Sequence, residues 1–86
     1  MKFDKECLNY FLEHQMQLFP EKVAETLEEA DEFLEDCMAV ICKNKKEVRA
    51  YFEESGADIA GMSMEDILKA EEVFALGDGR YLIVEA

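Results

Sequence analysis

Eighty-six residues and about 9.9 kDa suffice for one domain with one modest core, so we expect residues 1–86 to fold as a single unit. Half of the residues are apolar and 35% are charged, which excludes a disordered polar chain and a membrane span. The 9 Lys and Arg against 21 Asp and Glu leave a formal net charge of -12 at pH 7. This balance argues against direct binding to nucleic-acid phosphates and against docking on an anionic membrane.

The start of the chain and its cysteines indicate the compartment. Residues 1–19 carry charges among their apolar residues, so they lack the uninterrupted apolar core of a secretory signal, and we expect a cytoplasmic protein. The three cysteines, Cys7, Cys37 and Cys42, are an odd number without a C-x-x-C pair. This pattern argues against a disulfide framework and against a cysteine zinc site. We expect the thiols to act as small hydrophobic groups in buried or half-buried places.

The first predicted element is a helix from Lys5 to Leu18. Asp4 is a good N-cap, and Phe3 before it can pack on Leu8 in the first turns. Apolar residues recur at the helical period and form one broad face that we expect to be largely buried. This face consists of Cys7, Leu8, Phe11, Leu12, Met16, Leu18 and Phe19.

A second helix is predicted to begin at Pro20, which suits the first turn, with Glu21 favourably placed for the helix dipole. Its apolar stripe runs through Val23, Leu27, Ala30 and Leu34. Acids fill the opposite face, because residues 21–36 contain eight acids and one base. We take the following as a candidate partner-binding face: Glu21, Glu25, Glu28, Glu29, Glu32, Glu35 and Asp36.

A continuous apolar run, residues 37–42, comes next and ends at a polar cluster that contains three lysines. Its length and its Val-Ile pair favour a strand buried on both faces, although a continuation of the second helix stays open as the alternative. A short helix is predicted over residues 45–55, with Gly56 suited to the left-handed conformation after its end.

The last third of the chain predicts a loop, a short helix and a hairpin. The loop covers residues 57–62, and Ser63 is the expected cap of a helix over residues 64–70, with Asp66 three positions on. Two apolar β-favouring runs, 73–76 and 81–84, flank Gly-Asp-Gly and form a β-hairpin signal. The order is ααβααββ, which predicts an α+β domain whose three-stranded, mostly antiparallel sheet packs against helices.

Residue types that carry chemistry are scarce, and we expect no catalytic residue, no cofactor and no metal site. His14 lacks the Glu-x-x-His pattern of diiron proteins, because Phe11 stands three positions before it. The acids lack the D-x-D-x-D-G loop of a calcium site, and the Gly77 to Gly79 pair lies in a turn instead of opening a helix. Asp78 and Arg80 flank that turn and are candidates for partner contact.

The leading hypothesis is a non-enzymatic cytoplasmic interaction or regulatory module whose acidic helix face meets a basic protein partner. Simple solvation of an outer face is the alternative use of these acids. A narrower hypothesis is an acidic inhibitor or immunity protein, or a nucleic-acid mimic, that covers a basic site. A homodimer is a further hypothesis, based on methionines beside the main apolar stripes. A remote alternative is a small enzyme that uses one of the cysteines with His14.

Overall fold

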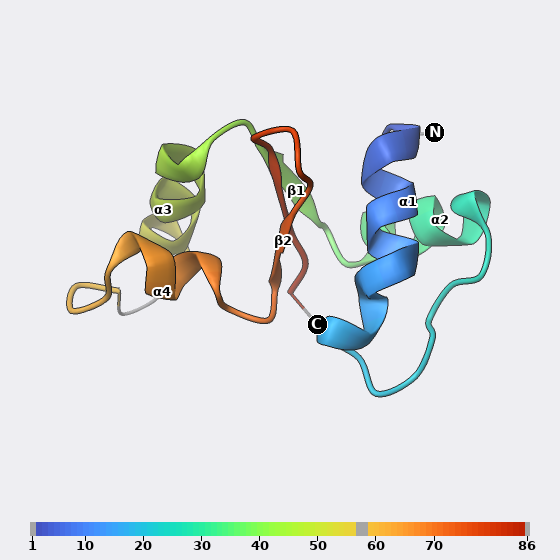
Figure 1. The fold of residues 1–86 in the computed structure, drawn as a ribbon, viewed down its shortest axis with the longest axis horizontal. Helices are drawn as coiled ribbons and strands as arrows, with labels where there is room; N and C mark the ends of the chain where they lie inside the picture. The colour runs from blue at the N-terminus through green and yellow to red at the C-terminus, as the bar shows by residue number, and fades with distance from the viewer. Residues whose placement is uncertain (1, 57–58, 86) are drawn as a thin grey trace.

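A three-stranded antiparallel sheet separates two pairs of helices (Figure 1). The computed structural model describes residues 2–56 and 59–85. The predicted order ααβααββ and the α+β class are confirmed. In chain order the elements are α1 (Lys5–His14), the 3₁₀ turn η1 (Gln15–Gln17), α2 (Leu27–Asp36), β1 (Val40–Cys42), α3 (Lys45–Glu54), α4 (Met64–Leu68), β2 (Val73–Ala75) and β3 (Tyr81–Ile83).

Strand β3 lies in the middle of the sheet, in the order β1-β3-β2, and pairs antiparallel with both neighbours. Successive side chains of a strand point to opposite faces. Leu82 therefore packs towards α1 and α2, whereas Ile83 packs towards α3 and α4, and both are buried. The sheet thus divides the interior into two cores that share one central strand, whereas the chain length had predicted one core.

Each core joins one helix pair to one face of the sheet. The N-terminal core, on the right of Figure 1, is built from Phe3, Cys7, Leu8, Phe11, Ala24, Ala30, Leu34, Ala39, Phe74, Leu82 and Val84. The C-terminal core, on the left, is built from Cys42, Val48, Phe52, Ile59, Ile67, Val73 and Ile83. Ile59 belongs to a segment predicted only as a loop, of which residues 57–58 lie outside the described residues.

Local sequence signals account for most helix ends. Asp4 caps α1 by accepting a hydrogen bond from the Cys7 amide, and Ser63 caps α4 through the Asp66 amide, as predicted. The predicted hairpin is confirmed, and its two turn glycines have φ angles of 89° and 93°, which favour residues without a side chain. Helix α3 likewise ends before Gly56, whose φ is 84°.

The predicted start of the second helix at Pro20 is wrong. Helix α2 begins seven residues later, at Leu27, with Thr26 as its N-cap, so Glu21 and Glu25 lie in the preceding segment and not on the helix. The reason is the buried side chain of Gln15. Its Oε1 accepts hydrogen bonds from the amides of Val23 (2.7 Å) and Ala24 (3.1 Å), and its Nε2 donates to the carbonyl of Ala24 (2.9 Å). These bonds hold segment 20–26 in a non-helical path.

The apolar run 37–42 was predicted to form a strand or to continue the second helix, and the structure shows part of each. Cys37 ends α2, and Met38 takes the left-handed conformation with φ of 57°. The Ala39 amide then donates to the Leu34 carbonyl, which completes a Schellman turn. Only Val40 to Cys42 form the predicted strand.

None of the helices in the described residues has the length and apolar character that a membrane span requires.

Gln15→Ala should destabilise the protein, because it leaves the buried amide and carbonyl of Ala24 and the half-buried amide of Val23 without partners. Each unsatisfied buried group costs about 1–3 kcal/mol, so the two buried groups of Ala24 predict a loss of about 2–6 kcal/mol in the free energy of unfolding. Gln17→Ala is the matched control: this exposed neighbour donates two hydrogen bonds to carbonyls, and its loss should cost about 1 kcal/mol. Urea unfolding measures both, and equal losses would contradict the role of Gln15.

Candidate functional site

Five acids of α2 form an exposed surface that we call the acidic face: Glu28, Glu29, Glu32, Glu35 and Asp36. Of the seven predicted residues, Glu21 and Glu25 are exposed too but belong to the segment before α2. Glu25 stays close to the helix start, because its amide donates to Glu29 Oε1 at 3.0 Å. The structure therefore brings five predicted acids onto one helix and holds a sixth beside its first turn.

No cation of the described residues forms an ion pair with the acidic face. Within residues 2–56 and 59–85, the ion pairs involve Arg49 and Arg80, whose carboxylate partners all lie outside α2. Lys22 is the nearest base in the sequence, and no ion pair joins it to the acidic face in this part of the chain. The carboxylates of α2 thus repel one another without internal compensation.

The end of α2 combines two features that cost stability with an exposed methionine. Glu35 and Asp36 lie in the last turn, where the helix dipole disfavours negative charge by about 0.3–1 kcal/mol each. Met38 follows in a left-handed conformation that glycine or asparagine would adopt more easily. Its side chain is 81% exposed, more than any other large hydrophobic side chain of the described residues. Two locally unfavourable features and an exposed apolar side chain therefore coincide at the end of α2.

A basic segment, Lys43, Lys45 and Lys46, lies at the other end of β1, where α3 begins. All three lysines are exposed, and Lys45 and Lys46 stand at the positive end of the α3 dipole, which disfavours cations. The helix start is already capped by the chain itself, since Asn44 accepts from the Glu47 amide and Glu47 accepts from the Lys43 amide. From the sequence, these lysines were identified as a polar cluster before a predicted helix, but no functional role was predicted for them.

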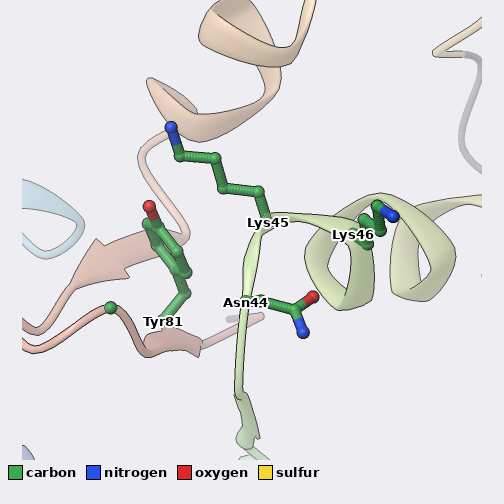
Figure 2. Close-up of a pocket in the computed structure, with 5 residues that line it drawn as sticks. Asn44, Lys45, Lys46 and Tyr81 are labelled. Carbon is green, nitrogen blue, oxygen red and sulfur yellow. The ribbon is translucent and has the colours of Figure 1, made fainter.

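An open depression of about 490 Å³ adjoins the basic segment, between the start of α3 and the hairpin turn. In Figure 2, Lys45 extends from the helix start towards the side of Tyr81, whereas Lys46 turns away along α3. Asn44 and Gly79 complete the lining. The Glu47 amide is used by the cap, so the depression presents mainly the Lys45 ammonium group and the Tyr81 phenol.

The turn candidates Asp78 and Arg80 are engaged within the chain. Arg80 Nε donates to Asp78 Oδ2 at 2.8 Å, and Arg80 Nη1 donates to Asp4 Oδ2 at 2.7 Å. Asp4 also caps α1 with its other oxygen. The hydrogen bond from Arg80, followed by that from the Cys7 amide, lowers the pKa of Asp4 below its ordinary value. Arg80 therefore fastens the hairpin turn to the start of α1.

The cysteines and His14 do not form a nucleophilic pair in the contacts observed. Burial raises the pKa of Cys7 to about 11 and also raises the pKa values of Cys37 and Cys42, so all three remain thiols at neutral pH. His14 stacks on the ring of Tyr10 with centroids 3.9 Å apart, and its Nδ1 lies 2.9 Å from the Tyr10 carbonyl oxygen.

No group of three or more His, Cys, Asp or Glu side chains that could hold a metal ion occurs in residues 2–56 and 59–85. Comparison of the chain with family models, with curated proteins and with solved structures finds no match. The arrangement of charges on the surface is therefore the feature from which a function has to be argued.

Asp4→Asn should remove the ion pair with Arg80 but keep the helix cap, at a cost of about 0.2–1 kcal/mol at pH 7. Asp4→Ala loses the cap as well, for a total of about 1–2 kcal/mol. Since the folded-state pKa of Asp4 is lowered, its contribution is present above pH ~4 and is lost as the pH falls through the folded-state value. Urea unfolding should therefore show the gap between wild type and Asp4→Asn shrinking from pH 6 to pH 2.5, and an unchanged gap would contradict the assignment.

Proposed function

We propose that this chain is a non-enzymatic cytoplasmic protein-interaction module whose acidic face recognises a basic surface of another protein. The observation that carries the proposal is an acidic face that no cation of the described residues pairs with and that ends in an exposed methionine on a disfavoured backbone conformation. Natural sequences are locally consistent, and departures from that consistency concentrate at functional sites. Solvation alone explains acids spread over a surface, but it does not explain acids placed against a helix dipole.

Electrostatics favours a basic partner. Opposite charges steer two proteins together and accelerate their association, whereas like charges exclude wrong partners. An exposed apolar group beside the charges adds area that is removed from water on binding. Met38 at the end of the acidic face fits that place, because its unbranched thioether adapts to irregular partner surfaces.

An acidic inhibitor, immunity protein or nucleic-acid mimic is the second reading of the same surface. Here the basic partner is an enzyme or binding protein whose cationic cleft ordinarily holds nucleic acid. The small size and the net charge of -12 support this reading. Competition distinguishes the two, because duplex DNA would displace the chain from such a partner but not from a partner that binds no nucleic acid.

Self-association into a homodimer is a separate candidate function of the surface. Met16 and Met38 are 54% and 81% exposed, and they add apolar area that a second copy could cover. The thiol chemistry of a small enzyme receives less support, because the raised pKa values of the cysteines keep the thiolate form scarce.

The triple variant Glu25→Gln, Glu28→Gln and Glu32→Gln tests recognition of a basic partner. It keeps Glu29, whose carboxylate bonds to the Glu25 amide, and it leaves the end of α2 unchanged. Proteins captured from native lysate by immobilised wild type should bind the variant on the order of tenfold more weakly, since each rim charge contributes about 0.5 kcal/mol. Quantitative mass spectrometry measures the loss.

The matched control is Glu13→Gln, Glu65→Gln and Glu71→Gln, which removes the same charge from exposed positions outside α2. The control should capture the same proteins as wild type. Equal loss in both triple variants would show that net charge and not the acidic face determines binding. Undiminished capture by the variant of Glu25, Glu28 and Glu32 would show that these acids do not contribute to binding.

A further inference from the structure

The hydrogen bonds of β3 determine which edge groups of the sheet point outward. The Leu76 amide donates to the Arg80 carbonyl, and the Val84 amide donates to the Glu72 carbonyl, so residues 80, 82 and 84 face β2. Residues of an antiparallel strand alternate between the two neighbours. Tyr81 and Ile83 therefore face β1, where they pair with Cys42 and Val40, and the backbone groups of Ile41 point away from the sheet.

The two edges of the sheet differ. On the β2 edge, Gln17 Nε2 donates to the carbonyls of Glu71 (3.0 Å) and Val73 (2.9 Å), so a side chain already lies along that strand. On the β1 edge, the amides of Ala39 and Lys43 point outward on either side of Ile41, and both are bonded within the chain. The Ala39 amide donates to the Leu34 carbonyl, and the Lys43 amide donates to the Glu47 carboxylate. In the part of the chain that the structure describes, no hydrogen bond is made by the amide or carbonyl of Ile41 on that side.

Side-chain burial also indicates that β1 is incompletely covered. Val40 and Ile41 are only half-buried, although their register partners Ile83 and Leu82 are fully buried. Val40 contributes to the C-terminal core and Ile41 to the N-terminal core, so both faces of β1 expose apolar area at the edge. Edge strands of this kind readily pair with another strand.

Opposite charges flank this edge. The acids Glu35 and Asp36 precede β1, and the basic segment Lys43, Lys45 and Lys46 follows it. The extended stretch from Ala39 to Asn44 spans about 16 Å at ~3.3 Å per residue, and no ion pair joins the two charge groups within the described residues. Each group also lies at the helix end where its sign is disfavoured.

We infer that β1 pairs antiparallel with β1 of a second copy of this chain, with the two-fold axis at Ile41, to form a six-stranded sheet. This inference rests on the self-association proposed above. The symmetric register places Val40 beside Cys42 of the second copy, and the basic segment of each copy beside the acids that end α2 of the other. This single pairing gives hydrogen-bond partners to the Ile41 amide and carbonyl and covers the half-buried side chains of Val40 and Ile41. It also places the acids at the end of α2 beside the lysines at the start of α3 of the other copy.

Charge reversal tests the pairing. The acid-end variant is Glu35→Lys with Asp36→Lys, and the base-end variant is Lys43→Glu with Lys46→Glu; all four positions are exposed. Wild type should dimerise in sedimentation equilibrium, and each variant alone should dimerise at least tenfold more weakly. An equimolar mixture of the two variants should form a heterodimer, because every charged end then meets its opposite.

The controls separate this pairing from general charge effects. Glu13→Lys with Glu65→Lys, and Lys22→Glu with Lys69→Glu, make the same charge changes at exposed positions away from β1. The acid-end variant lowers the magnitude of the net charge from -12, so nonspecific repulsion predicts tighter dimers, whereas the β1 pairing predicts weaker ones. Ile41→Pro adds a check on the backbone, because it removes an outward amide that has no bond within the described residues.

A monomer at 1 mM wild type would overturn the inference, as would a dimer that the acid-end variant does not weaken or a mixture without heterodimer. If Ile41→Pro does not fold, the charge variants decide alone. The test for recognition of a basic partner is independent of the test for β1 pairing, because the partner test leaves Glu35 and Asp36 unchanged. A monomeric chain that still captures basic proteins through Glu25, Glu28 and Glu32 would refute the pairing and retain the interaction module.

Discussion

The structure depends on the burial of β3 on both faces. Three residues in the middle of a small sheet supply Leu82 to one core and Ile83 to the other, with exposed fractions of 0% and 1%. Neither helix pair could close a core without this strand, because each pair packs on only one face of the sheet (Figure 1). A chain of 86 residues can build two cores in this way because one short strand serves both.

The central position of β3 makes β1 and β2 edge strands, and the two edges differ in the groups that lie along them. Gln17 occupies the β2 edge, while the β1 edge lies between acids and lysines that form no ion pair with one another in the described residues. The same charges stand against the dipoles of α2 and α3. The region from the end of α2 to the start of α3 therefore combines surface charge, backbone strain at Met38 and an unpaired strand edge. The surface proposed for recognition thus lies beside an edge strand of the sheet.

Signals confined to a few neighbouring residues predicted much of this structure. The caps Asp4 and Ser63 and the two turn glycines act on their own backbone, so their elements were predicted correctly. The start of α2 could not be predicted, since Pro20 and Glu21 suit a helix but Gln15 bonds the following segment from another element. The acidic face was identified from helical spacing. The open edge needed the strand order, which the sequence does not specify, and the exposed Met38 needed the backbone conformation.

Residue-resolved amide hydrogen exchange tests most directly whether the β1 edge is open in one copy and closed by a second. The amide of Ile41 should exchange rapidly at micromolar concentration and progressively more slowly towards 1 mM. The amide of Ala75, which points outward from the opposite edge, should exchange at the same rate throughout. An Ile41 amide that exchanges equally fast at both concentrations, or one already protected in the dilute monomer, would contradict the account.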